Sequence, residues 1–286
     1  DVLRDISLDV ARGEFVTLLG ASGCGKTTTL RIISGLETPD EGSVILNGKD
    51  VTDLPPEKRP VNTVFQSYAL YPHMTVYKNM AFGLSLQKMP KDEIDRKVHE
   101  VAKILDLEHL LNRKPKALSG GQRQRICIAR ALALKPEFIV CDEPVSALDV
   151  SIQAQIINLL KELQEQYKFT YLFISHDLSV VEHISDTVGV MYLGNLVEYG
   201  ATEDIFKNPL HPYTKALFSA IPVPDPTAKM NRIVLEGSIP SPANPPAGCK
   251  FHTRCAQCME QCKTEVPEQR EIEPGHFVVC HLYDQK

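Results

Sequence analysis

The stretch Gly20-Ala21-Ser22-Gly23-Cys24-Gly25-Lys26-Thr27 decides the fold of this chain. It comes directly after residues 15–19, Phe-Val-Thr-Leu-Leu, whose apolar character predicts a short buried strand. It leads into residues 27–35, which are typical of a helix that ends at a glycine. A glycine-rich loop that leaves a strand and opens a helix indicates an α/β fold.

The spacing of this loop, Gly-x-x-x-x-Gly-Lys-Thr, predicts a phosphate-binding site. Glycines let backbone N–H groups converge on phosphate oxygens at the start of a helix. Lys26 adds a compact cation for the β- and γ-phosphates, and Thr27 offers a hydroxyl to Mg²⁺. The alternative, a glycine-rich turn with a chance lysine, fits the strand and helix context poorly. The residues expected to contact nucleotide here are Gly20, Ser22, Gly23, Cys24, Gly25, Lys26, Thr27 and Thr28.

Composition narrows the class of protein. The 286 residues include 43% hydrophobic and 23% charged residues, which is ordinary for a globular chain. A net charge of -5 gives no reason to expect a nucleic-acid partner. No apolar run approaches the roughly 18 residues that suggest a membrane span, and no secretory leader opens the sequence. We therefore expect a cytosolic protein whose membrane role, if any, comes through a partner.

The rest of the chain alternates short apolar runs with helical patterns, which indicates a doubly wound α/β core. Strands are expected at 1–10, 43–47, 63–65, 138–141 and 171–174. Helices are expected at 92–111, 119–134 and 151–166.

Two acids follow the fully apolar strand expected at 138–141. Ligands bind at the carboxyl edge of an α/β sheet, so Asp142 is placed to hold Mg²⁺. Glu143 is placed to orient or deprotonate an attacking water. The alternative is a pair of solvated acids in a turn, and the buried strand before them disfavours it.

A third motif is Leu118-Ser119-Gly120-Gly121-Gln122. Ser119 is expected to cap a helix whose first N–H groups point at an anion. Taken alone, this is a common helix cap with glycines.

Together these motifs carry a family resemblance. In order, the chain has the phosphate loop, Gln66, the Ser119 motif, Asp142-Glu143, Ser146-Ala147-Leu148-Asp149 and His176. With these, it resembles the nucleotide-binding subunit of ATP-binding-cassette (ABC) transporters. The resemblance implies a P-loop NTPase domain of ABC type over 1–221, with an antiparallel β subdomain and a helical subdomain inserted at about 70–135.

The resemblance also implies roles for single residues. Gln66 would sense Mg²⁺ and the attacking water and link to the membrane subunit. Asp149 would communicate across a dimer, and His176 would contact the γ-phosphate. Outside the family context, Gln66 and His176 are more often ordinary loop residues. An aromatic residue that stacks on adenine is expected upstream of Asp1.

In this family, each ATP lies between the phosphate loop of one subunit and the Ser119 loop of the other. We therefore expect a head-to-tail dimer, with itself or a sister subunit, on the cytoplasmic face of a membrane. Integral permease subunits would be its direct partners, and a substrate-binding protein an indirect one. A soluble ABC ATPase is a weaker alternative, because the chain has neither a long coiled-coil insertion nor two cassettes.

Two branches of the family are represented. Up to about residue 118, segments such as 55–59 and 64–73 resemble the ATPases of maltose-type sugar importers. From about residue 126, segments 138–151 and 208–215 resemble dipeptide and oligopeptide importers. A natural mosaic and an engineered chimera both remain open. We expect a peptide importer, with a sugar importer as the alternative.

Residues 222–286 are expected to form a Pro-rich and Cys-rich extension. Seven prolines lie between Pro222 and Pro246, and five of the eight cysteines lie between 249 and 280. The tail is similar to that of peptide-importer ATPases, which implies a [4Fe–4S] cluster on Cys249, Cys255, Cys262 and Cys280. Zn²⁺ is an alternative, because Cys255 and Cys258 form a C-x-x-C pair. Disulfides are a third interpretation, disfavoured by a cytosolic compartment, and a set of free thiols is a fourth. An interaction or regulatory module in which this tail has the main role is a competing function for the whole chain.

Overall fold

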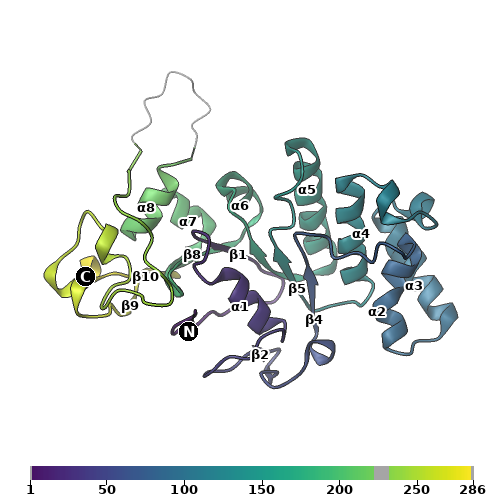
Figure 1. Ribbon diagram of the computed structural model, residues 1–286, viewed down its shortest axis with the longest axis horizontal. Coiled ribbons are helices and arrows are strands. Elements are labelled where there is room, and N and C mark those ends of the chain that lie inside the picture. The colour runs from purple at the N-terminus through teal and green to yellow at the C-terminus, as the bar shows by residue number, and fades with distance from the viewer. Residues whose placement is uncertain (1, 222–231, 285–286) are drawn as a thin grey trace. The chain divides into compact units, whose positions relative to one another are not determined.

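The computed structural model describes residues 2–221 and 232–284 (Figure 1). The chain divides into two compact units. One combines Asp1–Thr29 with Ile174–Lys286, and the other is Leu30–Phe173. We call them the phosphate-loop unit and the middle unit, and describe each by itself. Within the described ranges, no helix is both long and apolar enough to pass through a bilayer.

In the middle unit, β4 (Val61–Val64), β5 (Phe138–Asp142) and β6 (Thr170–Ile174) are neighbours in one sheet, in that order. Strands β4 and β5 are parallel, with Val61 opposite Phe138 and Val64 opposite Cys141. A separate two-residue hairpin joins β2 (Ile45–Leu46) to β3 (Lys49–Asp50). The buried parallel strand expected at 138–141 is confirmed, and it delivers Asp142 and Glu143 to its carboxyl end.

Helices α2 to α5 of this unit are packed together, and Ser119 is the N-cap of α4. These helices are α2 (Val76–Leu86), α3 (Lys91–Ile104), α4 (Gly120–Leu132) and α5 (Val150–Tyr167). Helices α2, α3 and α4 pack on one another, and α4 also packs on α5 (Figure 1). In α3, Ile94, Val98 and Val101 recur at helical spacing and are buried. Single 3₁₀ turns occur at Pro56–Lys58, Glu108–Leu110 and Pro115–Ala117.

The phosphate-loop unit contains five strands in the order β1 (Phe15–Leu19), β7 (Thr187–Tyr192), β8 (Asn195–Ala201), β10 (His276–Val279) and β9 (Gln269–Glu273). Strand β1 is parallel to β7, and the remaining pairs are antiparallel. Its helices are α6 (Leu178–Ile184), α7 (Thr202–Lys207) and α8 (Pro212–Phe218). Helix α1 (Lys26–Ile33) begins in this unit, directly after the glycine loop.

The end of the chain is part of this sheet, because β10 pairs with β8 through Phe277 opposite Tyr199. The buried carboxylate of Glu198 reinforces the junction. It accepts hydrogen bonds from the backbone N–H groups of Leu210 (2.7 Å) and His211 (2.9 Å), and it contacts His276 Nε2 at 2.8 Å. The C-terminal strands are therefore fastened to β8 and to the start of α8.

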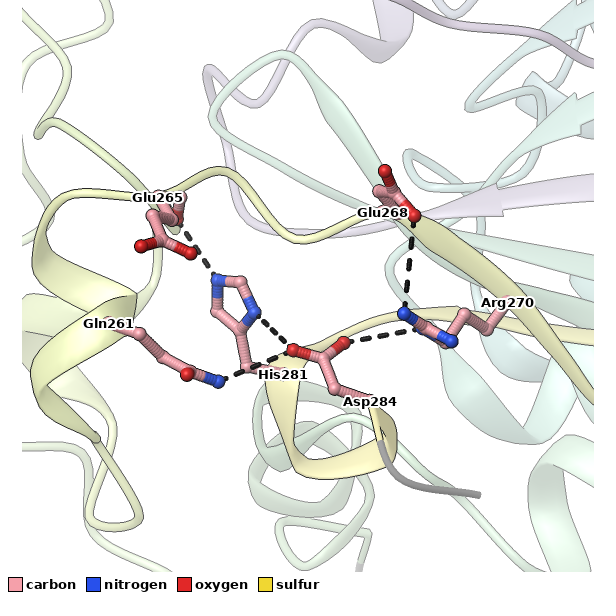
Figure 2. A network of polar contacts seen from close by, with 6 residues as sticks. All are labelled: Gln261, Glu265, Glu268, Arg270, His281 and Asp284. Carbon is pink, nitrogen blue, oxygen red and sulfur yellow. Dashed lines mark hydrogen bonds and ion pairs between the residues drawn. The ribbon is translucent and has the colours of Figure 1, made fainter.

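A polar network secures the last turn of the chain, His281–Tyr283 (Figure 2). The Asp284 carboxylate contacts His281 Nδ1 at 2.8 Å, Gln261 Nε2 at 3.3 Å and Arg270 Nε at 3.3 Å. His281 Nε2 donates to the carbonyl oxygen of Glu265 at 3.1 Å. Two further 3₁₀ turns, His252–Arg254 and Glu260–Lys263, belong to the same region.

The strand expected at 1–10 is wrong for residues 2–10, and Asp1 lies outside the described residues. The alternation is real, since Ile6, Leu8 and Val10 are half-buried and their neighbours are exposed. However, Asp5 has a left-handed φ of 48°, which interrupts extended backbone. Amphipathic alternation alone does not supply a partner strand, and no ladder forms.

Candidate functional site

The phosphate loop forms a tight turn between β1 and α1. Gly20 has a φ of 144°, and a Cβ there would lie 2.2 Å from the carbonyl oxygen of Met191. Gly25 has a φ of 105°, and a Cβ there would lie 2.5 Å from Leu3. Both angles favour glycine, and at Gly20 the nearby backbone oxygen also leaves no space for a side chain. The glycines therefore permit a backbone path that other residues would adopt only with strain.

Lys26 is buried and folds back onto this loop. Its Nζ donates to the carbonyl oxygens of Gly20 (2.7 Å) and Ala21 (3.1 Å) and lies 3.5 Å from Cys24 Sγ. These carbonyls are the partners that phosphate oxygens would replace. Thr27 is exposed at the start of α1, and the N–H of Thr29 donates to the carbonyl oxygen of Gly25 at 2.9 Å.

In the middle unit, Ser119 caps α4 through a reciprocal pair of hydrogen bonds. The N–H of Gln122 donates to Ser119 Oγ at 3.3 Å, and the N–H of Ser119 donates to Gln122 Oε1 at 3.0 Å. These two bonds form a capping box. The first turn of α4 has no bulky side chains at its start, because residues 120 and 121 are glycines. Gly121 packs against Ile152, where a Cβ would come within 2.6 Å. The cap expected from sequence is confirmed, whereas the expectation that the start of α4 faces an anion stays a prediction.

The carboxyl end of β5 brings Glu143 beside Gln66. Gln66 Nε2 donates to Glu143 Oε2 at 3.2 Å and to Ser146 Oγ at 3.0 Å. Glu143 has a left-handed φ of 45°, which is a strained backbone conformation for a residue with a side chain. Other described residues without a proposed role, such as Lys88 and Asp106, have similar angles, so the hydrogen bond to Gln66 is the more specific feature of Glu143. Asp142 is the last residue of β5 and is half-buried.

The segment after Gln66 is held against α4, which sequence reasoning missed. Tyr68 and Ala69 have consecutive left-handed φ angles of 63° and 44°. The guanidinium of Arg123 lies 5.1 Å from the centre of the Tyr68 ring, and Arg130 donates to the carbonyl oxygen of Ala69. We call residues 66–69 with these two arginines the Gln66 clip. The signal in the sequence was only the pair of arginines at helical spacing, which could not identify their target.

The two remaining single-residue predictions have simpler surroundings. Asp149 caps α5, because its carboxylate accepts from the N–H of Ile152 at 3.0 Å. His176 is exposed in the loop after β6. The structure thus gathers Gln66, Glu143 and Ser146 in the middle unit, whereas Lys26 and His176 belong to the phosphate-loop unit.

The cysteine tail does not form a metal site in the described residues. Within 2–221 and 232–284, no three His, Cys, Asp or Glu side chains are placed to hold a metal ion. Burial is the main cause that raises the pKa of Cys280 to about 12, and it also raises the pKa values of Cys249 and Cys255. The described structure therefore gives no support to the predicted [4Fe–4S] cluster or to the Zn²⁺ alternative.

Comparison with known proteins gives the class. A family model described as "ABC transporter" matches residues 3–146. A second, described as "Oligopeptide/dipeptide transporter, C-terminal region", matches residues 197–262. The chain belongs to the ABC transporter family, as an ATPase with the C-terminal region of the oligopeptide and dipeptide branch.

Relatives agree along nearly the whole chain. A putative peptide import ATP-binding protein of Brucella ovis is 49% identical, over 98% of this chain and 91% of the relative. The oligopeptide transport ATP-binding protein AppF of Bacillus subtilis is also 49% identical, over 97% and 88%. OppF of Haemophilus influenzae is 43% identical, over 97% and 87%.

Solved structures match the ABC cassette fold. The ATP-binding cassette MJ0796, as a dimer in a post-hydrolysis state with ADP and Pi, has a TM-score of 0.63 and 33% identity. The match covers 70% of this chain and 90% of that one. CbiO1 of Clostridium perfringens, part of an ABC transporter complex, has a TM-score of 0.67 and 30% identity, over 72% and 84%.

The matches to peptide-transport proteins include the residues before 118. Because relatives of this branch align over 97–98% of the chain, the comparisons give no support to a separate sugar-importer origin for that part. The similarity to maltose-type ATPases therefore stays a sequence-based hypothesis.

Proposed function

We propose that the chain hydrolyses ATP to power an importer of dipeptides or oligopeptides. One observation carries this proposal: relatives named as peptide import or oligopeptide transport ATP-binding proteins share 43–49% identity over nearly the full chain. The matching C-terminal region at 197–262 supports the same branch.

The proposed chemistry is attack of water on the γ-phosphate. Lys26 exchanges its loop carbonyl partners for phosphate oxygens, and the loop N–H groups hold the remaining charge. Glu143 accepts a proton from the attacking water, and Gln66 positions the Glu143 carboxylate and this water. His176 contacts the γ-phosphate. The hydrogen bond from Gln66 to Glu143 supports the roles proposed for these two residues.

Magnesium suits the donor set of the proposed site. Hydroxyl, carboxylate and amide oxygens are the ligands that Mg²⁺ prefers, and Thr27, Asp142 and Gln66 supply one of each. The two hydrogen bonds made by Gln66 use its nitrogen, so its amide oxygen is not engaged in them. When bound with ATP, the ion neutralises developing charge on the phosphates. A [4Fe–4S] cluster or Zn²⁺ is not part of this proposal.

We further propose that two cassettes share each ATP. In the partner cassette, Ser119, Gly120, Gly121 and Gln122 cover the phosphate, and Asp149 lies near the junction. The capping box supports this role, because the Ser119 oxygen accepts one bond and its hydrogen is still able to donate. A related cassette, MJ0796, forms a dimer. The second cassette is either another copy or a sister subunit.

A groove on the helical region of the middle unit is the proposed docking place for the membrane subunits. It has a volume of about 380 Å³. It lies between α2 and α3 and is lined by Tyr77, Ala81, Phe82 and Ile94, with Lys78 and Lys91 also present. An amphipathic segment of a permease would bury its apolar side there. The protein would thus work peripherally at the cytoplasmic face of the membrane.

The experiment is transport in cells that lack the native gene. Complementation with this chain and its permease should restore uptake of a labelled tripeptide, and the Glu143→Gln variant should not. Restored maltose uptake without tripeptide uptake would favour the sugar-importer alternative. Co-purification from native membranes would identify the permease.

A further inference from the structure

A tyrosine far along the chain holds the phosphate loop. The hydroxyl oxygen of Tyr213, at the start of α8, accepts a hydrogen bond from the N–H of Ala21 at 2.9 Å. Tyr213 is buried, with 3% of its surface exposed, and 192 positions separate the two residues. No motif of the nucleotide site includes this contact.

The contact falls on one particular peptide group. The N–H of Ala21 and the C=O of Gly20 belong to the same planar peptide. Its carbonyl oxygen accepts from Lys26 Nζ at 2.7 Å, while its N–H donates to Tyr213. When Lys26 turns to a phosphate, the carbonyl side is released. The hydrogen bond to Tyr213 then still fixes the orientation of this peptide.

Tyr213 belongs to an aromatic cluster that reaches the cysteine tail. Its ring centre lies 4.8 Å from Tyr192 and 5.5 Å from Phe251, and Tyr192 and Phe251 lie 5.2 Å apart at 85°. All three are buried in one core cluster, against which the partly buried Cys249 and Cys255 pack. Phe251 sits inside the loop 249–255, so the tail forms one wall of the Tyr213 environment.

Hydrogen bonds within the phosphate-loop unit hold both Tyr213 and the loop that carries Phe251. The N–H of Tyr213 donates to His211 Nδ1 at 3.0 Å, and the N–H of His211 donates to buried Glu198. The N–H of Cys249 donates to the carbonyl oxygen of Cys262 at 2.9 Å, and this bond joins the two ends of the segment that contains Phe251. The tail is further tied down by the network around Asp284 (Figure 2).

We propose that Tyr213 is a positioning residue of the phosphate loop, and that the cysteine-bearing loop 249–255 supports it through Phe251. The inference rests on the proposed nucleotide site at Lys26. In this proposal Tyr213 does not touch nucleotide and acts through the Gly20–Ala21 peptide. Its role does not depend on whether the cysteines of the tail are free thiols. The C-terminal region thereby sets the affinity of a nucleotide site that lies early in the sequence.

The test compares tyrosines that differ in this one bond. Tyr213→Phe keeps the ring and removes the acceptor of Ala21. Tyr192→Phe makes the same chemical change on the neighbouring ring, whose hydroxyl lies near the side chain of Arg254. Calorimetric titration of dilute, full-length protein with Mg-ADP gives the dissociation constant without turnover. ATPase assays then give KM and kcat separately.

Loss of one hydrogen bond should weaken Mg-ADP binding about 3- to 10-fold in Tyr213→Phe. The KM for ATP should rise with it, while kcat stays within about 2-fold, because the bond orients the loop rather than the reacting atoms. Tyr192→Phe should bind as the wild type. If the melting temperature of nucleotide-free Tyr213→Phe equals that of the wild type, its weaker binding comes from the loop and not from general loss of structure. Equal affinities for Tyr213→Phe and Tyr192→Phe would overturn the role of Tyr213.

Phe251→Leu keeps apolar bulk and tests the tail. This variant should also weaken Mg-ADP binding. In the double variant Tyr213→Phe/Phe251→Leu, the fold-loss of affinity should be smaller than the product of the two single fold-losses, because both changes act through Tyr213. A fold-loss equal to that product would show that Phe251 does not act through Tyr213. Lys26→Ala reports on the proposed function separately. If the wild type does not bind nucleotide, or Lys26→Ala binds equally well, the proposed function fails as well as the inference.

Discussion

The side-chain nitrogen of Gln66 lies 3.2 Å from Oε2 of Glu143, so a residue at the end of β4 is hydrogen-bonded to one at the end of β5. Parallel pairing brings these ends to one edge, with Val64 opposite Cys141. The contact joins the candidate base to the segment that begins at Gln66. Any shift of that segment, for example by a docked membrane subunit, would change the surroundings of the Glu143 carboxylate.

Replacing Glu143 by Gln should abolish turnover and preserve nucleotide binding. The amide keeps the size and can still face Gln66, but it cannot accept a proton from water. A reduction in kcat of about 10²- to 10⁴-fold is expected for loss of a general base. Single-turnover ATPase assays and Mg-ATP titration measure the two effects. Turnover by this variant near the wild-type rate would remove Glu143 from its proposed role.

Arg123→Ala should loosen the Gln66 clip. The variant loses the cation–π contact with Tyr68, worth about 0.5–1 kcal/mol at an accessible site, while Arg130 still holds Ala69. Residues 66–69 should exchange amide hydrogens faster, which hydrogen-exchange mass spectrometry detects. Arg125→Ala is the matched control, because Arg125 donates to the carbonyl oxygen of Leu105 instead. Similar exchange in both variants would show that Arg123 does not restrain this segment.

Acid should destabilise the phosphate-loop unit through His211. Burial lowers its pKa from 6.5 to about 4, with Lys215 adding to the shift and Glu198 opposing it. The unfolded chain therefore binds the proton more readily between these values, and stability is lost as pH falls through this window. From pH 7 to pH 5 the loss amounts to about 2 kcal/mol for this group.

His211→Asn tests this claim, because Asn can also cap α8. His276 contacts Glu198 in the wild type and in the variant, so its own pH dependence is common to both. The quantity to compare is the free energy of unfolding that each protein loses from pH 7 to pH 5. Urea unfolding at pH 7 and pH 5 should give the variant a smaller loss than the wild type. An equal loss in both proteins would exclude His211 as the source.

Local sequence predicted the parts of the site that depend on local physics. The glycine loop between β1 and α1, the Ser119 cap with Gln122, and the buried run before Asp142 each depend on a few neighbouring residues. The same kind of reasoning failed at residues 2–10, because a strand needs a partner that its own alternation does not specify.

The missed contacts join residues that are distant in sequence. Tyr213 with Ala21, and Arg130 with Ala69, are set by how elements pack, and no spacing rule relates them. The cysteines illustrate the opposite case: their spacing suggested ligands, but no group of three potential ligands is placed to hold a metal ion among the described residues. Sequence thus predicts the chemistry of the proposed nucleotide site, and the structure was needed to see which distant residues contact its loops.

The central claim is that ATP is clasped between Lys26 of one cassette and Ser119 of another. The most direct measurement is specific ATPase activity against protein concentration, with mass determined by light scattering in the presence of Mg-ATP. The account predicts low activity for dilute single chains, and activity that rises as chains pair with a second copy or with a sister subunit. A chain that remains monomeric with Mg-ATP and hydrolyses at full rate at every dilution would contradict it.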